Sequence, residues 1–461
     1  MSQSKEKLLQ DMLQEEAACT SAKLAKRIGM SHEELKGAYQ RLKGQLPPLS
    51  PKTFGVADFF RRIMERDVLA DVQRILSFRE QQFVFPDSLE LHLGPACQCA
   101  CRFCWRWDNG QWTRGDLGLY RKELRTAQHL KASEFRSLSG LLKIEEVQAL
   151  FRDFKRGGGQ RLYFSGGLEF FTSPIAEDAI RCAVDTGITS LFVYTNGVAN
   201  CFDKPEFLEL LVESAESIRF SLHAATPETY AFVQMPHRPQ DEAEMEFRNV
   251  RHRIERILQM RNQMQSANRK AKIGVAFLVV GRNLHELRDA IQWMTRIGID
   301  DCDIRVDMCE KEAWFSEEEI TDLKRILGTI QEDREKGVFS PMVVNARFDA
   351  NEHIRQKLKQ QHVTHCRIPL KKPAVDPWGY VYECCYRNHP SMQDDGFLLG
   401  KFPEKSLSEI LRGVHSSPRY PRIHCRDCTD WEMAYNACVE KVLSDWDQGI
   451  SPDELPYEAK P

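Results

Sequence analysis

From residue 88 onward the chain alternates short apolar, β-rich segments with segments long enough for one helix, such as 173–187 and 283–298. The expected strands are "SLELHLG" (88–94), "RLYFSG" (161–166), "SLFVYTN" (190–196), "SIRFSLH" (217–223), "IGVAFLVV" (273–280) and "CDIRVDM" (302–308). This alternation predicts a parallel sheet, closed fully or partly into a barrel. Functional residues of such a fold gather at the carboxyl ends of the strands.

Composition limits the classes of function that this fold can serve. The 461 residues include 64 Lys and Arg against 67 Asp and Glu, and this net charge of −3 argues against a nucleic-acid partner. We expect no membrane segment, because no apolar run approaches the roughly 18 to 20 residues that cross a bilayer. The N-terminus lacks a secretory signal, so we expect a cytoplasmic protein. Its 15 cysteines therefore point to metal or redox chemistry rather than to disulfides.

Three regions are expected along the chain. Residues 1–85 are interpreted as helical, with a helix-turn-helix-like rhythm around Gly29. A small helical subdomain over an enzyme core fits the acidic balance better than a DNA-binding module. Residues 86–320 hold the strand–helix alternation, and residues 321–461 form a C-terminal region that carries further cysteines.

Directly after the first expected strand, "GPACQCACRFCW" (94–105) places Cys97, Cys101 and Cys104 as CxxxCxxC. Such a loop can wrap three thiolates around one face of an iron–sulfur cube, because thiolates are the ligands that these irons prefer. Three ligands leave one iron open to chelate a small molecule. The alternative is a zinc site, which needs a fourth nearby Cys or His that Cys99 offers only with poor geometry. We therefore interpret the loop as an iron–sulfur site, with Cys99 as a bystander.

A CxxxCxxC loop at the end of the first strand of a partial barrel resembles the radical S-adenosylmethionine (radical SAM) superfamily. The resemblance implies an α/β fold with a partial (β/α)6 TIM-like barrel, a 4Fe–4S cluster and S-adenosylmethionine (SAM). Together these groups yield a 5′-deoxyadenosyl radical that abstracts hydrogen from a substrate. An electron donor such as flavodoxin or ferredoxin is also implied.

The same resemblance assigns SAM contacts to successive strand ends. "SGGLE" (165–169) is similar to the GGE motif of the family, which meets the methionyl amino group, although Leu168 is inserted and Phe170 replaces the usual proline. Taken singly, each residue has an ordinary interpretation as a turn, a loop or a helix cap, but their order behind the cysteine loop favours SAM binding. The implied contacts are Phe103 at adenine, Gly166, Gly167 and Glu169 in the motif, Asn196 after the third strand, Ser221 at the ribose or carboxylate and Arg305 at the carboxylate.

Two residues at strand ends are candidate catalytic groups. His223 follows the fourth expected strand, and imidazole suits general acid–base work near neutral pH. Tyr194, at the end of the third strand, is a comparable candidate.

Several phrases along nearly the whole chain resemble the radical SAM amino-sugar deaminases of macrolide-sugar biosynthesis. They include "VFPDSLELHLGPACQCACRFCWR" (84–106), "LYFSGGLEFFTSP" (162–174) and "GYVYECCYRNHP" (379–390). The resemblance implies a radical at a sugar carbon and loss of a neighbouring amine or hydroxyl group. We expect a carbohydrate-like substrate, a nucleotide sugar or an aminoglycoside, that is deaminated, dehydrated or dehydrogenated.

A second set of cysteines follows the pattern C…GxxxxC…CxxC, with Cys366, Cys384, Cys425 and Cys428. The pattern resembles the SPASM/twitch class of C-terminal extensions, which hold an auxiliary iron–sulfur cluster. "DPWGYVYECC" (376–385) predicts a β-hairpin, which we expect to bring Cys366 and Cys384 together. Cys385 could replace Cys384, and a structural zinc ribbon is the alternative. An auxiliary cluster also suits oxidation, epimerisation or peptide modification, so a peptide-modifying enzyme or an epimerase is the alternative function.

Overall fold

The computed structural model describes residues 68, 75–77, 83–104, 140–165, 168–264, 271–306, 315–346, 365–385, 398–415, 422–423 and 430–448. The chain divides into two compact units, which are described separately. The barrel unit comprises Phe85–Ala346 and Ile368–Tyr420, and the flanking unit comprises Met1–Val84, Arg347–Arg367 and Pro421–Pro461. Residues 1–67 lie outside the described residues, and both the helical N-terminal region and the boundaries of the three predicted regions stay predictions.

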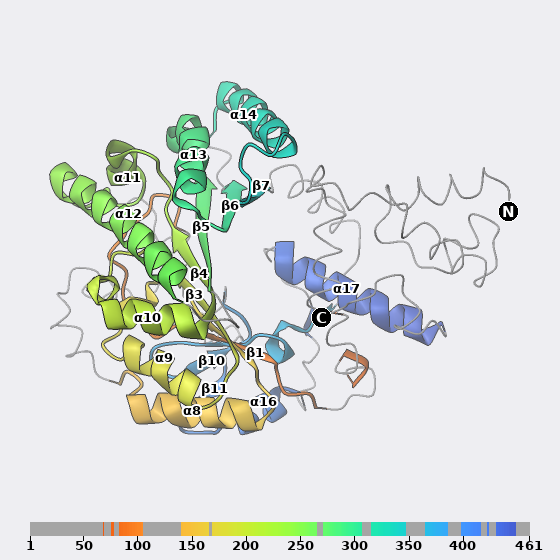
Figure 1. The fold of residues 1–461 in the computed structure, drawn as a ribbon. Coiled ribbons are helices and arrows are strands. Elements are labelled where there is room, and N and C mark those ends of the chain that lie inside the picture. The colour runs from red at the N-terminus through yellow and green to blue at the C-terminus, as the bar shows by residue number, and fades with distance from the viewer. Residues whose placement is uncertain are drawn as a thin grey trace, which may run out of the picture. The chain divides into compact units, whose positions relative to one another are not determined.

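The described strands of the barrel unit form one ten-stranded sheet (Figure 1). Seven of these strands follow one another in chain order across the sheet, and each runs parallel to the next. The predicted α/β partial barrel and its six strands are thus confirmed, and one short strand, β7, is added. The strands are β1 (Ser88–Leu91), β2 (Arg161–Phe164), β3 (Ser190–Thr195), β4 (Ala215–Ser221), β5 (Lys272–Val279), β6 (Asp301–Val306) and β7 (Val343–Ala346).

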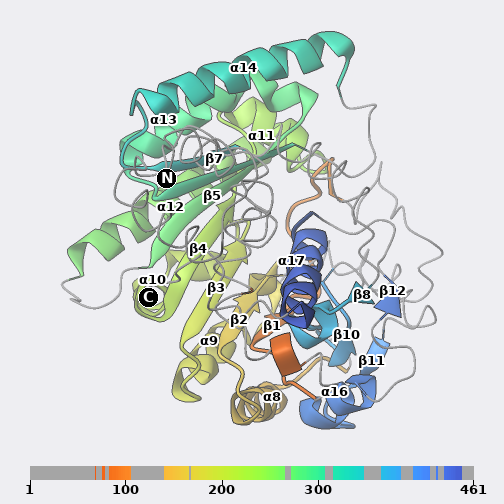
Figure 2. The same cartoon turned by 90° about the vertical axis from the view of Figure 1, so that its right-hand side faces the viewer.

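Helices connect the parallel strands and cover one face of the sheet (Figures 1 and 2). Helix α9 (Ala176–Asp185) buries a stripe of small apolar residues at helical spacing. Helix α13 (Leu287–Ile297) buries a stripe of mostly large apolar residues and ends at Gly298, whose φ of 85° is the left-handed conformation that suits a helix C-terminus. The other connecting helices are α8 (Ile144–Arg156), α10 (Pro205–Ser214), α11 (Pro227–Val233), α12 (Gln240–Gln263) and α14 (Glu317–Glu335).

The two faces of the sheet differ because side chains alternate along each strand. On the face toward the helices, Phe164 of β2 is fully buried and packs against Phe151 of α8. On the opposite face, Tyr163, Phe192 and Tyr194 are half-buried. We call this second face the inner face. It carries polar and aromatic side chains rather than an apolar core.

Residues 368–415 extend the sheet beyond β1. Strand β9 (Ala374–Val375) runs parallel to β1, and β10 (Tyr380–Tyr382) and β11 (Leu398–Lys401) continue antiparallel, followed by α16 (Leu407–His415). The predicted hairpin lies between β9 and β10. A Cβ at its Gly379, which has a φ of 85°, would lie 2.1 Å from the Phe402 carbonyl oxygen, so the turn requires glycine.

In the flanking unit, β8 (His365–Cys366) pairs antiparallel with β12 (Arg422–Ile423), and helix α17 (Asp430–Asp447) follows. Cys366 belongs to this unit and Cys384 to the barrel unit, so the predicted approach of the two cysteines stays a prediction. Among the described helices of the whole chain, none is both long and apolar enough to span a membrane.

Candidate active site

The cysteine loop, residues 94–104, leaves the end of β1 and is fixed on both sides by backbone hydrogen bonds. On one side the N–H of Glu169 donates to the carbonyl of Ala96 at 2.8 Å. On the other, the N–H of Ala100 donates to the carbonyl of Gln234, at the end of α11, at 3.0 Å. The loop is therefore held between the segments that follow β2 and β4.

Gly94 lets the cysteine loop approach the segment after β2. A Cβ at this position would lie 1.7 Å from the carbonyl oxygen of Glu169, which is backbone and cannot swing aside. The hydroxyl of Thr172 reinforces the approach by donating to the carbonyls of Ala96 and Glu169 at 3.1 and 2.7 Å. The position of Glu169 beside the loop thus depends on a glycine directly after the first strand.

The three predicted ligands, Cys97, Cys101 and Cys104, are half-buried, whereas Cys99 is only 4% exposed. The thiol of Cys99 contacts those of Cys97 and Cys101, and Cys104 lies near enough to Cys101 to interact with it electrostatically. The hydrogen bond to Cys99, together with burial, raises the pKa of the Cys97 thiol, and bound iron would deprotonate it.

The donor set fits an iron–sulfur cluster, because thiolates are the ligands that its irons prefer. A 4Fe–4S cluster takes one thiolate for each iron, so its ligands surround a group several ångströms wide rather than a point. Three half-buried cysteines on one anchored loop suit that requirement, and Cys97, Cys101 and Cys104 are the residues that would hold the cluster.

Glu169 is a buried carboxylate beside this loop, 4% exposed. It accepts hydrogen bonds from the hydroxyl of Thr195 at 2.8 Å and from the N–H groups of Asn196 and Phe171 at 2.7 and 3.3 Å. Burial raises the pKa of Glu169 to about 7, although these hydrogen bonds oppose the shift. An ammonium group beside the carboxylate would lower that pKa again, because it favours the charged form. The environment therefore suits the predicted contact with an amino group.

Asn196 connects Glu169 to the cysteine loop. Its N–H binds the Glu169 carboxylate, and its side-chain Nδ2 lies 3.5 Å from the sulfur of Cys97 and 3.2 Å from Oε1 of Gln98. Its Oδ1 accepts the N–H of Val198 at 2.9 Å, which shapes the turn after β3. One residue at the end of the third strand thus contacts both parts of the predicted SAM site.

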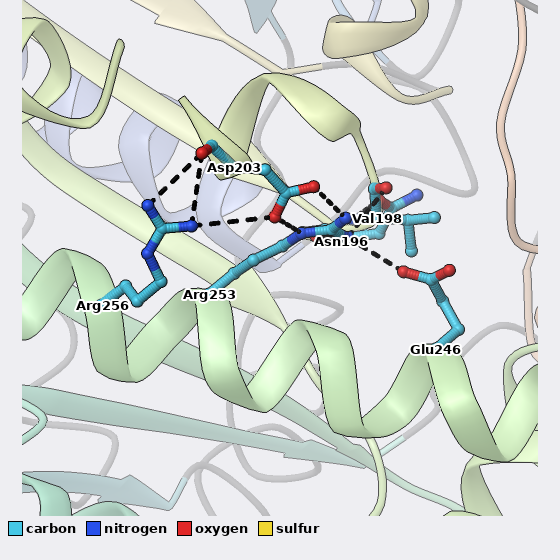
Figure 3. A network of polar contacts seen from close by, with 7 residues as sticks. Asn196, Val198, Asp203, Glu246, Arg253 and Arg256 are labelled. Atoms are coloured by element: carbon cyan, nitrogen blue, oxygen red, sulfur yellow. Dashed lines mark hydrogen bonds and ion pairs between the residues drawn. The ribbon is translucent and has the colours of Figure 1, made fainter. Parts of the chain in front are cut away.

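Arg253 of α12 fixes this turn from outside the sheet (Figure 3). It is 5% exposed and makes a bidentate ion pair with Asp203, at 2.8 and 2.7 Å. Its Nη1 also donates to the carbonyls of Gly197 and Val198, at 3.1 and 3.0 Å, and to Glu246, at 2.9 Å. The turn that carries Asn196 is therefore clamped by a buried guanidinium.

Gln234 performs a similar function at the end of β4. The residue is fully buried, and its Oε1 accepts the N–H of His223 at 2.7 Å while its Nε2 donates to the carbonyl of Ser221 at 3.2 Å. Its own carbonyl holds Ala100 of the cysteine loop. The half-buried Ser221 and the buried His223 are thus fixed relative to the predicted cluster ligands.

The imidazole of His223 is enclosed. Its Nδ1 accepts the N–H of Leu278 at 2.9 Å, so the proton of the neutral ring lies on Nε2. Its ring contacts that of Phe103 edge-on at 4.8 Å, which brings two predicted site residues together. Burial, with a smaller contribution from Arg305, lowers the pKa of His223 to about 3. At neutral pH the residue is therefore a hydrogen-bond donor through Nε2 and carries no charge.

A charged row crosses the inner face from β4 to β6. Arg219 of β4 pairs with Asp301 at 2.8 Å and with Asp303 at 3.3 Å, both on β6. It passes over β5 at Gly274, where a Cβ would lie 2.8 Å from the carboxylate of Asp301. The missing side chain on β5 is what allows the ion pairs to span two strands.

Arg305 and Tyr194 flank this row. Arg305 pairs with Asp303 at 2.6 Å, and its side chain is 45% exposed. Tyr194 is half-buried, and the guanidinium of Arg219 lies 5.9 Å from its ring centroid. Both predicted residues therefore belong to the inner face. The proposed contact of Arg305 with the SAM carboxylate and the catalytic role of Tyr194 stay predictions.

A second charged group lies at the other side of the inner face, on β1. Glu90 pairs with Lys372, from the segment before β9, at 2.9 Å. It also contacts His92 at 3.1 Å and accepts the hydroxyl of Ser165 at 2.5 Å. Burial opposes ionisation of Glu90, but Lys372 and the other contacts outweigh it and hold its pKa well below the usual range. The C-terminal segment thus contributes a cation to the first strand of the barrel.

Some predicted residues lie outside the described residues, namely Gly166, Gly167, Cys425 and Cys428. Cys384 and Cys385 are half-buried at the end of β10. Cys366 of the flanking unit is half-buried on β8, and Nδ2 of Asn436 on α17 lies 3.9 Å from its sulfur. Its partner strand β12 ends two residues before Cys425 in the sequence.

Sequence reasoning missed residues that position the site. Gln234 and Arg253 carry no local signal, because one ends a helix and the other lies within one, and their partners are distant in sequence. Glu90 did have a signal in the sequence. Glu90 and His92 are the polar residues of an otherwise apolar strand, and their spacing of two residues places both side chains on one face of the sheet.

The family comparison defines the class of this domain. Residues 91–294, from β1 into α13, match the model of the radical SAM superfamily. The matched range holds the cysteine loop, Glu169, Asn196 and His223. These residues therefore form a radical SAM domain, and the family implies a 4Fe–4S cluster and SAM. The prediction of a radical SAM domain is confirmed for these residues.

Among curated proteins, the chain is similar to the dTDP-4-amino-4,6-dideoxy-D-glucose ammonia-lyase of Streptomyces venezuelae. The two are 25% identical over 347 residues, which cover 71% of this chain and 64% of the relative. The chain thus spans less than two thirds of the length of that relative.

Among solved structures, the chain is similar to SuiB of Streptococcus suis, bound to S-adenosylmethionine in one structure and to the precursor peptide SuiA in another. Each comparison has a TM-score of 0.50 at 12% identity and covers 84% of this chain and 79% of SuiB. At this identity the likeness concerns the fold alone, and it supports the partial barrel.

Proposed function

We propose that the protein is a radical SAM enzyme that acts on a carbohydrate-like substrate, a nucleotide sugar in the first instance. The observation that carries the proposal is the hydrogen-bonded connection from the cysteine loop through Asn196 to Glu169. It joins a three-cysteine loop to a buried carboxylate at the strand ends of a radical SAM domain. The sugar substrate rests on similarity to the ammonia-lyase.

When bound, the cluster and SAM would supply a 5′-deoxyadenosyl radical that removes a hydrogen atom from the substrate. The residues of the chain prepare the site for that step. Glu169 would bind the amino group of SAM. Asn196 holds the Glu169 carboxylate in a fixed position relative to Cys97. Phe103 lies against His223 and is the expected contact of adenine. Ser221, fixed by Gln234, is the expected contact of the ribose or carboxylate.

The inner face provides groups that suit a polar, polyhydroxylated substrate. The pair formed by Glu90 and Lys372 and the row around Arg219 flank the stacked rings of Tyr163 and Phe192, whose centroids are 4.7 Å apart. Ionised side chains form the stronger hydrogen bonds to hydroxyl and amine groups. Elimination of water or ammonia, or oxidation at the radical carbon, would follow hydrogen abstraction. Tyr194 and His223 remain our candidates for contacts that assist the leaving group.

We further propose an auxiliary iron–sulfur cluster held by Cys366, Cys384, Cys425 and Cys428. This rests on the spacing of the four cysteines. The pairing of β8 with β12 supports one part of it, because β12 directly precedes the CxxC pair in sequence. The proposal also includes a reducing compartment, the cytoplasm, as the location of the protein. A flavodoxin or ferredoxin would serve as its electron donor.

The test compares variants of the cysteine loop under anaerobic conditions. Reconstituted protein is incubated with SAM and dithionite, and iron, sulfide and 5′-deoxyadenosine are measured. The Cys97→Ala/Cys101→Ala/Cys104→Ala variant should lose nucleoside release entirely, whereas Cys99→Ala, from the same loop, should retain it because Cys99 is buried and holds no iron. Iron and sulfide remaining in the triple variant report the auxiliary cluster, and a Cys366→Ser change should remove them.

The substrate is tested with the same protein. dTDP-4-amino-4,6-dideoxy-D-glucose should accelerate SAM cleavage and be consumed. Nucleoside release that survives in the triple variant overturns the proposed function. Consumption of a peptide but of no sugar would instead favour the peptide-modifying alternative.

A further inference from the structure

The cysteine loop and helix α11 meet at an exposed basic and aromatic surface. Phe232 of α11 is 41% exposed. The guanidinium carbon of Arg102, from the cysteine loop, lies 4.0 Å from the centroid of its ring, and that of Arg282, after β5, lies 5.3 Å from it. Both arginines are exposed. We call these three residues the Phe232 patch.

The charges of the Phe232 patch are not neutralised within the described part of the chain. No described carboxylate lies within ion-pair distance of Arg102 or Arg282. The arginines near the site behave differently, because Arg219 and Arg253 are both paired with aspartates. The chain as a whole has a net charge of −3, so two cations on one exposed ring, with no carboxylate partner among the described residues, are a local feature.

The patch is coupled directly to the predicted cluster site. Arg102 immediately follows Cys101, and the Cα atoms of consecutive residues are about 3.8 Å apart. The N–H of Arg102 donates to the carbonyl of Val233 at 2.9 Å, and its Nε donates to the carbonyl of Phe232 at 2.8 Å. A molecule seated on Phe232 would therefore contact the same turn of chain that would hold the cluster.

From this arrangement we propose that the Phe232 patch is the docking surface for a small electron-transfer protein with acidic groups around its redox centre. The proposal rests on the proposed function, which requires one electron from outside the chain. In the docked complex the donor is oxidised by one electron and the cluster is reduced by one, with no bond made or broken. Acidic groups complement the two guanidiniums, and the exposed ring supplies the apolar centre of the contact. Electron-transfer complexes use small interfaces, so a compact patch suffices.

The test measures docking separately from chemistry. A bacterial flavodoxin, in its oxidised form, is titrated anaerobically into the reconstituted protein by calorimetry at low and at raised ionic strength. The Arg282→Glu variant should raise the Kd at least about tenfold and flatten its salt dependence, because charge pairs across an interface are screened by salt. Phe232→Ala should also weaken binding, and Arg282→Lys, which keeps the charge, should restore it.

Arg181→Glu on α9 is the matched control, because it makes the same change in net charge at another exposed arginine and should leave the Kd unchanged. In turnover, dithionite should support equal SAM cleavage by wild type and Arg282→Glu, whereas cleavage driven by reduced flavodoxin should fall in the variant. Equal Kd values for wild type and Arg282→Glu, or an equal loss in Arg181→Glu, overturn the docking surface. Absence of dithionite-driven cleavage in the wild type instead overturns the proposed function. The calorimetric titration still shows whether flavodoxin binds at the Phe232 patch.

Discussion

The imidazole of His223 lies between two strand ends and has a defined proton position. Its residue type and position alone predict a proton carrier near neutral pH. The structure adds that Nδ1 accepts a backbone N–H and that burial lowers the pKa to about 3. The residue therefore acts at neutral pH as a fixed donor, and protonating it would break the hydrogen bond to Leu278.

This shifted pKa predicts an acid sensitivity of folding. The pKa of His223 is lowered from 6.5 to about 3 in the folded state, so between these values the unfolded chain binds the extra proton. The contribution of neutral His223 to the free energy of unfolding is therefore fully present above pH 6.5 and is lost as the pH falls toward 3. By about pH 5 the loss should reach about 2 kcal/mol. Thermal unfolding of wild type and His223→Gln, compared at pH 7 and at about pH 5, checks this. An equally steep acid loss in both proteins would contradict it.

Residue type pointed to candidate chemical groups of the site, but not to the residues that hold them in place. Cys97, Glu169 and Asn196 could be predicted because cysteine spacing and strand-end position are visible in the sequence. Gln234 could not, since its role arises from three contacts with residues 11 to 134 positions away. No sequence pattern distinguishes a buried glutamine at the end of a helix from an exposed one.

Helix α12 shows how an element outside the inner face determines a turn within the site. Arg253 is one of several basic residues on a long helix, and the helical pattern does not distinguish it from Arg256. The structure does distinguish them. Arg253 is buried and makes five hydrogen bonds to four residues, whereas Arg256 makes long hydrogen bonds of 3.3 Å to the carbonyl of Asp203 (Figure 3).

Replacing Arg253 should therefore impair SAM binding as well as stability. Arg253→Met leaves Glu246, whose side chain is 13% exposed, without this cation and frees the turn that carries Asn196. Asp203 is 49% exposed and keeps a 4.0 Å contact with Arg256, so the loss of unfolding free energy should be about 2 kcal/mol, below the cost of a fully buried pair. The displaced turn should raise the Kd for SAM about tenfold. Both are measured on anaerobically reconstituted protein, by thermal unfolding and calorimetry.

Arg256→Met is the matched control on the same helix and should change neither quantity appreciably, because exposed pairs contribute little. Arg253→Lys keeps the charge but cannot make the bidentate pair, so it should lie between the two. A stability loss with unchanged SAM affinity would assign Arg253 a purely structural role.

At the scale of the whole molecule, the alternation of strands and helices predicted the parallel sheet, because each buried strand and amphipathic helix has its own period. It did not predict β7, which follows the last strand of the predicted alternation. Nor did it predict that residues 368–382 would lengthen the sheet on the far side of β1. That pairing joins segments nearly three hundred residues apart, and nothing in the sequence of either strand indicates which strand it pairs with.

Buried ion pairs hold this distant pairing and can be tested. Lys371 is 2% exposed and pairs at 3.0 Å with Asp87, which directly precedes β1 and also pairs with Arg161 at 3.2 Å. Lys371→Met leaves a buried carboxylate with one cation fewer, so the free energy of unfolding should fall by about 2 kcal/mol. Asp87→Asn combined with Lys371→Met should recover part of this loss, because no excess buried charge remains. Lys336→Met, at an exposed pair, is the control in denaturant titrations. Additive losses in the double variant would mean that the two residues act independently and that this ion pair does not help to hold β9 to β1.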